Sequence, residues 1–380
     1  MPTTNSPQAV RVLHFVTGGL GSGAAQVAIT LVKSALGGPV SPLLVLRRKS
    51  STDSEKLEEL KAAGVPFEIV ANFPHWLTVW QLFRICRRFR PDVLVAHGYR
   101  EHIWGRYAGL LAGVPKLVHV EHNREKYSWW RLLQARWLAR RTARIVGVSD
   151  GVKNRLLELG FPEDRTVSIL NGIRLAPFAE ADRIEFSSRK AGIVMCARFA
   201  RQKDHSTLIR AVGLLRERGL TPPLLLAGGG KSRYRKSAQK LAQRLNLGDQ
   251  VQFLGHYGDV PRLLMQHQIC VLSTHYEGMG LALVEGMAAG CAVVGTAVLG
   301  VREWFVDGRD GRLVPENDAL ALADMLEQLL RNPEVAARLA ATARQAALER
   351  HGLELMSQRY ETLFLQLAVK PPRLLPSPMR

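Results

Sequence analysis

Short, mainly apolar runs alternate with helical patterns along most of the chain. Such runs stand at residues 10–16, 42–46, 93–96, 192–196 and 292–295. Strands without regular polar alternation are typical of parallel sheets that helices cover on both faces. The alternation therefore predicts an α/β fold built on doubly wound parallel sheets. With 380 residues, of which 47% are hydrophobic, the chain is long enough for two such domains.

Composition along the chain suggests where these domains end. A first domain is predicted over residues 1–178 and a second over residues 191–352. Residues 179–190 have few aliphatic side chains and mixed charge, which favours a linker. A further helix is predicted at residues 353–369, and the proline-rich segment 370–380 is predicted to be a disordered tail.

The most informative pattern lies in the second domain, where a strand, a polar turn and a helix follow one another. The strand at 269–273 ends at Ser273, the turn contains Gly278, Met279 and Gly280, and the helix begins at Leu281. In parallel sheets ligands bind beyond the carboxyl ends of the strands, so this turn is expected to line a site. Free backbone N–H groups at the start of such a helix favour a phosphate.

Two glutamates flank this turn and helix. Glu285 lies about one helical turn past the predicted phosphate site, where a carboxylate can accept two hydrogen bonds from a vicinal diol such as ribose. Glu277 lies on the turn, where it can hold another hydroxylated ring. The pattern suits a sugar joined through a diphosphate to a nucleoside.

These residues carry a resemblance to a known family. Glu277 and Glu285 are separated by seven residues and are followed by Gly300-x-x-Glu303 and Asp307-Gly308-x-x-Gly311. This arrangement resembles the donor site of retaining glycosyltransferases of family 4, over nearly the whole chain. The resemblance implies a GT-B fold, in which two Rossmann-like domains face a central cleft and the last helix crosses back to the first domain. It also implies that Glu277 contacts the donor sugar and Glu285 the ribose.

The resemblance further implies a UDP- or GDP-linked donor and a metal-independent reaction without a cofactor. Arg198 and Lys203 follow the strand at 192–196 and are placed to neutralise a diphosphate leaving group. The family has glycine before that arginine, whereas this sequence has Ala197. A histidine near the donor sugar is matched best by His122, with His119 as the second choice.

Glycine turns mark two further strand ends. Gly19 and Gly21 follow the first strand, and Gly255 closes the strand at 251–255, before the region that the resemblance assigns to the nucleobase. The first turn partly fits a dinucleotide fingerprint, which would suit an NAD-dependent oxidoreductase. The acidic residue expected about 20 residues later is missing, because the next strand runs into Arg47. Phosphorylases share the implied fold, but this chain is short for one.

The formal net charge of +19 needs a separate explanation. Residues 84–144 contain fourteen Lys or Arg against four acids, and the segments 76–90 and 126–144 mix these cations with tryptophan. Such a mixture suits an anionic membrane surface. The alternative is that the aromatic side chains face the core and the arginines face solvent. A nucleic-acid-binding protein would also be basic, but no nucleic-acid motif is present and the glutamate pair would be unexplained.

The same features suggest an acceptor and a location. A basic first domain favours a glycan or lipid-linked acceptor, as in lipopolysaccharide or polysaccharide synthesis. No signal peptide and no uncharged apolar run of 18 residues is found, so a cytoplasmic protein, peripheral at the inner face of the membrane, is expected. The four cysteines have no Cys-x-x-Cys spacing and are expected to be reduced.

Overall fold

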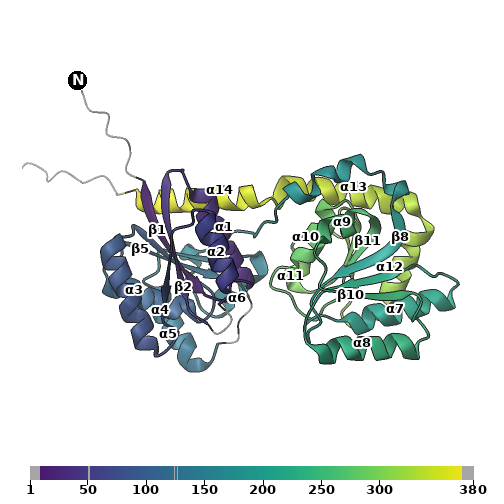
Figure 1. Ribbon diagram of the computed structural model, residues 1–380, viewed down its shortest axis with the longest axis horizontal. Helices are drawn as coiled ribbons and strands as arrows, with labels where there is room; N and C mark the ends of the chain where they lie inside the picture. Colours follow the sequence, from purple (N-terminus) through teal and green to yellow (C-terminus); the bar gives the residue numbers. More distant parts are fainter. Residues whose placement is uncertain (1–8, 50–51, 124, 126, 370–380) are drawn as a thin grey trace, which may run out of the picture. The chain divides into compact units, whose positions relative to one another are not determined.

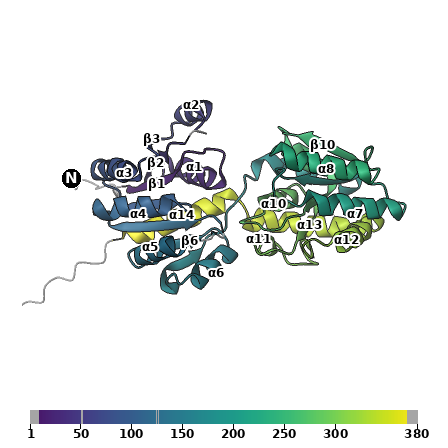
Figure 2. The same ribbon diagram turned by 90° about the horizontal axis from the view of Figure 1, so that it is seen from below.

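The computed structural model describes residues 9–49, 52–123, 125 and 127–369. They divide into two compact units, of which the second is Gly172–Leu353 and the first holds the residues on either side. Each unit is a parallel sheet covered by helices (Figures 1 and 2), which confirms the predicted doubly wound α/β fold. The predicted tail at 370–380 lies outside the described residues.

The first unit is built on seven parallel strands in the order β3-β2-β1-β4-β5-β6-β7. Their bounds are β1 (Val10–Thr17), β2 (Val40–Arg47), β3 (Phe67–Val70), β4 (Val93–His97), β5 (Lys116–Glu121), β6 (Arg144–Gly147) and β7 (Thr166–Ser168). The strand order reverses at β1, which pairs with β2 on one side and β4 on the other. Because β4 is buried along its whole length, apolar side chains fill both of its faces.

Seven helices of the first unit cover this sheet. They are α1 (Gly23–Ala35), α2 (Ser54–Ala62), α3 (His75–Phe89), α4 (Glu101–Leu111), α5 (Trp129–Ala139), α6 (Asp150–Glu158) and α14 (Leu353–Ala368). α5 covers only part of the basic segment 126–144, because it ends at Ala139. There the Thr142 hydroxyl donates to the Leu138 carbonyl at 2.8 Å, and the chain turns into β6.

The second unit has six parallel strands in the order β10-β9-β8-β11-β12-β13. Their bounds are β8 (Lys190–Cys196), β9 (Leu224–Ala227), β10 (Val251–Gly255), β11 (His267–Leu272), β12 (Ala292–Thr296) and β13 (Arg312–Val314). Its helices are α7 (His205–Glu217), α8 (Ser232–Arg244), α9 (Val260–Met265), α10 (Leu281–Ala288), α11 (Leu299–Arg302), α12 (Ala319–Arg331) and α13 (Pro333–Arg350).

Residues 179–190, predicted to be a linker, lie within this second unit. They form parts of two 3₁₀ turns, Ala176–Arg183 and Phe186–Ser188, and the start of β8. The buried Arg189 side chain donates to the carbonyls of Ala289 and Gly290, each at 2.7 Å, at the end of α10. The segment is therefore fixed against the body of the unit, and the chain passes between the units at Asn171–Gly172 and at Leu353–Glu354.

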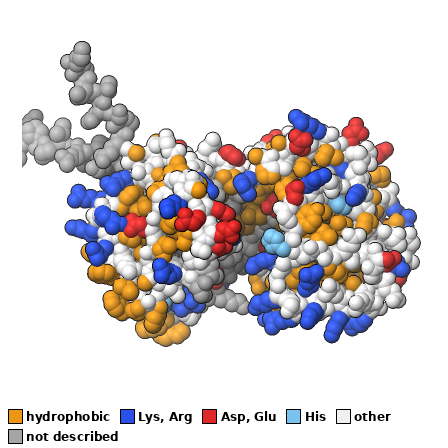
Figure 3. Space-filling view, viewed as in Figure 1, with side chains coloured by type: hydrophobic (Ala, Val, Ile, Leu, Met, Phe, Trp, Pro, Cys, Tyr) orange, Lys and Arg blue, Asp and Glu red, His pale blue; other side chains and the backbone are white. Residues whose placement is uncertain are grey.

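The tryptophans of α3 and α5 lie on the outside of the first unit. The buried side of α5 consists of Ala135, Leu138 and Ala139. Trp129, Trp130 and Trp137 on its other side are 46 to 70% exposed, and Trp76 and Trp80 on α3 are 69 and 47% exposed. Figure 3 shows hydrophobic side chains gathered on this part of the surface. The alternative that these aromatic side chains face the core is therefore wrong.

No helix in the described part of the chain is both long enough and apolar enough to cross a membrane. The four cysteines are unpaired, and three of them are buried.

Candidate active site

The predicted donor loops meet where the strand order of the second sheet reverses. β8 pairs with β9 on one side and with β11 on the other, so the loops that follow β8 and β11 leave the sheet side by side. A short antiparallel bridge joins Lys203 to Thr274 across these loops, and the Asp204 N–H donates to the Ser273 carbonyl at 3.0 Å. This edge of a parallel sheet is where ligands bind in such folds.

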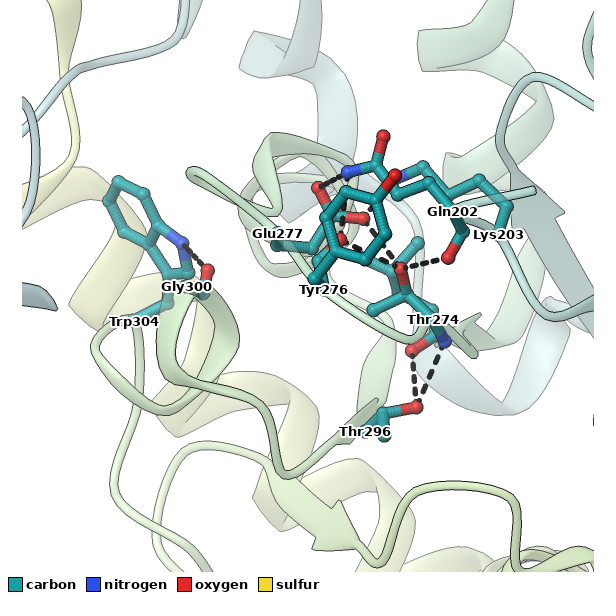
Figure 4. A network of polar contacts seen from close by, with 9 residues as sticks. Gln202, Lys203, Thr274, Tyr276, Glu277, Thr296, Gly300 and Trp304 are labelled. Carbon is teal, nitrogen blue, oxygen red and sulfur yellow. Dashed lines mark hydrogen bonds and ion pairs between the residues drawn. The ribbon is translucent and has the colours of Figure 1, made fainter. Parts of the chain in front are cut away.

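The Glu277 carboxylate is held by three side chains of these loops (Figure 4). Its Oε1 forms an ion pair with the Lys203 ammonium and lies 2.9 Å from the Thr274 hydroxyl. Its Oε2 accepts a hydrogen bond of 3.2 Å from the Gln202 amide, which also donates to the Tyr276 carbonyl at 2.8 Å. The sequence pattern indicated Lys203 and Glu277 separately, and the fold joins them directly. Because an ammonium group has three N–H donors, this pairing leaves Lys203 able to bind a phosphate as well.

Thr296 and Trp304, which no sequence motif indicated, and Gly300 of the Gly300-x-x-Glu303 motif complete this network. Thr296, the last residue of β12, accepts a hydrogen bond of 3.0 Å from the Thr274 N–H. Gly300 lies against the Glu277 backbone, and its carbonyl accepts from the buried Trp304 indole at 3.0 Å. The sequence could have indicated Thr296, because it is a polar residue at the end of the strand that pairs with β11, at the same sheet edge.

The start of α10 is open to an anion. Gly280 precedes the helix in the left-handed region, with φ of 51°, and neither a capping side chain nor a first-turn acid is present there among the described residues. Gly278 and Met279, just before it, are half-buried, as is Leu281, the first residue of the helix. The first N–H groups of a helix have no intrahelical acceptor, so they form a site of positive potential.

Glu285 lies one turn into α10. Its side chain is half-buried, and within the described residues its carboxylate has neither an ion pair nor a hydrogen bond. Burial raises the pKa of Glu285, and the charge of Arg174 partly opposes this effect. A carboxylate that is partly desolvated and unpaired is suited to accept hydrogen bonds from a ligand.

The other donor-site candidates of this unit lie on the loops after β8, β9 and β10. Arg198 is exposed and has no ion pair in the described part of the chain. Gly228 is required beside it, because a Cβ there would lie 2.0 Å from the Ala197 carbonyl. The Gly228 N–H donates to the Gly255 carbonyl at 2.7 Å, so the Gly255 turn is tied to the same edge.

Gly19 and Gly21 lie in the first unit, on the loop between β1 and α1. The Gly19 carbonyl accepts from the Ser22 N–H at 2.9 Å. The Ser22 hydroxyl in turn caps α1 by accepting from the Ala25 N–H at 3.3 Å. This start of a helix is therefore already occupied by a side chain, unlike that of α10.

His122 follows β5 in the first unit and is buried. Its Nε2 lies 3.3 Å from Nδ1 of His97, and its Nδ1 has no partner among the described residues. Burial lowers the pKa of His122 to about 3, so the ring is neutral. His119 lies inside β5 and stacks on His102, with ring centroids 4.1 Å apart. The two candidate histidines thus have different surroundings.

A second polar cluster surrounds His119. Arg106 donates to His102 Nδ1 at 2.5 Å, so a neutral His102 has its proton on Nε2, which lies 3.1 Å from the Tyr127 hydroxyl. That hydroxyl donates to Glu121 at 2.9 Å. Burial lowers the pKa of Arg106 to about 10 and raises that of Glu121 to about 7.

The spacing of this cluster raises the question of a metal ion. Three possible ligand atoms lie within 4.8 Å of one another, one each from His102, His119 and Glu121. A metal would need a lone pair from His102, yet Nδ1 accepts from Arg106 and Nε2 carries the proton that Tyr127 accepts. The residues therefore fit a closed hydrogen-bond network better than they fit a metal ion.

Comparison with known families agrees with this geometry. The family model of Glycosyltransferase Family 4 matches residues 21–176, and that of Glycosyl transferases group 1 matches residues 179–346. Together the two models span most of both units. The first match includes His122, and the second includes Lys203, Glu277 and Glu285.

Individual relatives are similar over much of their length. The EpsD protein of Bacillus subtilis is 30% identical over 56% of this chain and 58% of its own. The lipopolysaccharide core biosynthesis glycosyltransferase LpsE of Rhizobium meliloti is 27% identical over 76% of this chain and 78% of its own. The Escherichia coli UDP-Gal:alpha-D-GlcNAc-diphosphoundecaprenol alpha-1,3-galactosyltransferase is 25% identical over 62% of this chain and 66% of its own.

Solved structures show the same fold. Anabaena HepE in complex with UDP and glucose superposes with a TM-score of 0.80 at 20% identity, over 94% of this chain and 100% of its own. A glycosyltransferase from Rickettsia africae superposes with a TM-score of 0.84 at 20% identity, over 96% of this chain and 100% of its own. The chain therefore belongs to the glycosyltransferases of the family 4 type, with the GT-B fold.

Proposed function

We propose that this protein is a retaining, metal-independent glycosyltransferase. It takes a sugar from a UDP- or GDP-linked donor and transfers it to a hydroxyl of a glycan or lipid-linked acceptor. The observation that carries this proposal is the Lys203–Glu277 ion pair, which lies on the sheet edge of the second unit that also bears the uncapped start of α10. Cations, free N–H groups and carboxylates are the groups that a nucleotide sugar requires.

The leaving diphosphate is the first chemical problem of the reaction. Negative charge grows on it as the bond to the sugar breaks, and fixed cations lower the energy of that state. Arg198 and Lys203 supply two such cations, and the N–H groups at the start of α10 supply the positive end of a helix dipole. The protein's own residues thus provide the stabilisation for which other enzymes use a metal.

The two glutamates have different roles in this proposal. Glu285, partly desolvated and unpaired, accepts hydrogen bonds from the ribose hydroxyls of the donor. Glu277 orients the donor sugar, and its three side-chain partners keep it in place. The acceptor hydroxyl attacks the anomeric carbon from the side that the phosphate leaves. One carbon–oxygen bond breaks, another forms on the same face, and the acceptor proton passes to a phosphate oxygen. For His122, the family resemblance alone supports a contact with the donor sugar.

The names of similar proteins support a UDP-linked donor and a role in lipopolysaccharide or polysaccharide synthesis. The HepE complex contains UDP and glucose, the Escherichia coli relative is named for UDP-Gal and a diphosphoundecaprenol acceptor, and the Rhizobium relative for lipopolysaccharide core biosynthesis. A UDP-linked sugar and a lipid-linked saccharide acceptor are therefore the first substrates to test.

Donor binding can be measured by the thermal stabilisation of the purified protein, since a ligand that binds only the folded state raises its melting temperature. UDP, GDP, ADP, UDP-glucose, UDP-galactose, GDP-mannose and NAD would be compared with and without EDTA. We expect one nucleoside diphosphate to stabilise the protein, with the same shift in EDTA. A shift with NAD alone would overturn the proposal, and a shift that EDTA abolishes would overturn its metal-independent part.

We also propose that the first unit docks on an anionic lipid surface, at the inner face of the cytoplasmic membrane. The tryptophan face consists of Trp76, Trp80, Trp129, Trp130 and Trp137, all of them exposed. Arginines accompany the rings: the Arg84 guanidinium lies 5.0 Å from the Trp80 ring centre and that of Arg141 lies 3.8 Å from the Trp137 ring centre. Indole rings at headgroup depth and cations on anionic lipid are the elements of interfacial binding.

Flotation with phosphatidylglycerol-containing vesicles tests this surface. The double variant Trp129→Ser/Trp130→Ser removes two rings that stack on each other with centroids 4.5 Å apart, and we expect it to leave most of the protein unbound. Leu320→Ser, an exposed leucine of the second unit, is the matched control and should float as the unchanged protein does. Equal flotation of the double variant and the control would rule out this docking face.

A further inference from the structure

Three buried histidines of the first unit form a line across one face of its sheet. His14 lies in β1, His97 ends β4, and His122 follows β5, three strands that are neighbours in the order β1-β4-β5. Nδ1 of His14 lies 3.1 Å from Nε2 of His97, and Nδ1 of His97 lies 3.3 Å from Nε2 of His122. Both ring nitrogens of His97 thus have a histidine nitrogen as their partner.

The ring positions show that these are edge-to-edge contacts. The ring centroids are 5.4 Å apart for His14 and His97 and 5.5 Å apart for His97 and His122, with planes inclined by 24° and 29°. In each pair the distance between centroids exceeds the nitrogen–nitrogen distance by about the sum of the two ring radii. This is the value expected when the two bonded nitrogens lie on the line between the centroids. Face-to-face stacking would bring the centroids closer, as it does for His102 and His119 at 4.1 Å.

Burial keeps all three rings neutral. It lowers the pKa of His14 and His122 to about 3 and that of His97 well below its ordinary value. A neutral imidazole has one N–H donor and one acceptor nitrogen. In a row in which Nδ1 of one ring contacts Nε2 of the next, only two placements of the protons give every contact one donor and one acceptor. Either all three histidines carry the proton on Nδ1, or all three carry it on Nε2.

The two ends of the row have no hydrogen-bond partner among the described residues. At one end, Nδ1 of His122 is buried and unpartnered. At the other end, His14 lines a cavity of about 220 Å³ under α14, and its Nε2 is unpartnered. Tyr360 of α14 lines the same cavity with a buried hydroxyl that also lacks a partner, and Glu361 lies beside it. The cavity is therefore a place where a hydrogen-bonding group can meet His14.

We propose that His14 and His97 are positioning residues that fix which nitrogen of His122 carries its proton. We also propose that a group bound in the cavity under α14 selects this nitrogen through its hydrogen bond with His14. When an acceptor group in the cavity takes a hydrogen bond from His14 Nε2, every proton in the row lies on Nε2, and His122 offers a lone pair at Nδ1. When a donor group occupies the cavity, every proton lies on Nδ1, and His122 offers an N–H. The consequence for sugar transfer rests on the proposed function, but the linkage of tautomers does not.

Nitrogen NMR of the protein labelled with ¹⁵N in its eleven histidines tests this linkage without any ligand. Protonated and bare imidazole nitrogens have well-separated shifts, and the His14→Leu and His97→Leu variants assign the signals. We expect His14, His97 and His122 to share one tautomer, with nitrogen–nitrogen coupling across both hydrogen bonds. A row in which one of the three carries its proton on the opposite nitrogen, or in which the couplings are absent, would overturn the proposal.

Kinetics then test the effect on transfer. His97→Gln keeps one donor and one acceptor, whereas His97→Leu keeps neither. We expect His97→Leu to lower kcat on the order of tenfold, the effect of losing the partner that orients a functional histidine, while the KM for the donor stays within about twofold. His97→Gln should restore most of the lost kcat. Equal kcat in both variants and the unchanged protein would refute the positioning role. If no nucleotide sugar binds at all, the proposed function fails, whereas the NMR result still decides the histidine row.

Discussion

Gly300 and the backbone of Glu277 lie so close that no other residue fits at position 300. A Cβ placed there would lie 2.3 Å from the Glu277 carbonyl oxygen and 3.0 Å from the Glu277 Cβ. Gly300 is itself held by the indole of buried Trp304, which donates to its carbonyl at 3.0 Å. The loop after β12 is therefore a fixed surface against which the Glu277 loop is positioned.

Substitution of this glycine should damage the site more than the fold. In Gly300→Ala the methyl group must push the Glu277 loop aside, since its two nearest neighbours, the Glu277 carbonyl oxygen at 2.3 Å and carbonyl carbon at 2.7 Å, are main-chain atoms. We expect kcat to fall on the order of a hundredfold, because a displacement of about 1 Å in a positioned group has such an effect. Gly248→Ala, where a Cβ meets nothing within 4 Å, is the matched control for steady-state kinetics. A Gly300→Ala variant as active as this control would show that the contact is unimportant.

The two glutamates should differ in the kinetic parameter that they control. Glu277→Gln leaves the Lys203 ammonium without its ion pair and the donor sugar without its orienting carboxylate, so kcat should fall most. Glu285→Gln replaces one of the two carboxylate acceptors for the ribose hydroxyls by an NH2 donor, so the KM for the donor should rise most. Initial rates over a range of donor concentration separate the two effects. Similar losses of both parameters in both variants would contradict this division of roles.

The sequence predicted the fold more completely than the site. The apolar runs of β1, β4, β8 and β12 follow from local patterns, because a strand buried on both faces has few alternatives. The pairing of Lys203 with Glu277 joins residues far apart in the sequence, so it depends on strand order rather than on spacing. The line from His14 to His97 and His122 depends on strand order in the same way.

Local patterns were also insufficient for the tryptophans. A helix with Trp129, Trp130 and Trp137 can turn either its rings or its small residues to the core. The structure buries Ala135, Leu138 and Ala139, so α5 lies close to its neighbours and the larger rings remain outside. The end of α5 at Ala139 is not evident from the sequence either, because the Thr142 hydroxyl bond to Leu138 cannot be recognised from composition.

Donor affinity should depend on pH through Glu285. The desolvated carboxyl has a pKa above the 4.5 of an ordinary glutamate, and only its ionised form can accept two hydrogen bonds from a diol. As pH falls through this raised pKa, the donor should bind more weakly, at a higher pH than an exposed glutamate would require. Calorimetric titration with UDP-glucose, whose diphosphate does not titrate in this range, between pH 7.5 and 5.0 measures this change. In Glu285→Gln the dependence should disappear, and its persistence in that variant would assign it to another group.

The protein should be less stable in acid, because its fold buries histidines in their neutral form. The pKa in the folded protein is lowered to about 3 for His14 and His122 and to about 4 for His205, whereas that of an unfolded chain is 6.5. A lowered histidine pKa contributes stability that is complete above pH 6.5 and is lost as pH falls toward the folded value. Glu121 has the opposite sign, since its pKa is raised to about 7, so its contribution is present below 4.5 and is lost as pH rises through 7. The histidines outnumber it, so the net effect is a loss of stability in acid.

Urea unfolding at pH 7.0, 6.0 and 5.0 measures this loss. The variant His205→Phe keeps an aromatic ring on Phe199, from which His205 is now 4.2 Å away between centroids, but removes one group that must take up a proton on unfolding. From the two pKa values, its free energy of unfolding should fall by about 2 kcal/mol less than that of the unchanged protein between pH 7.0 and 5.0. An identical fall in both proteins would mean that His205 is protonated in the folded state and that burial does not keep it neutral.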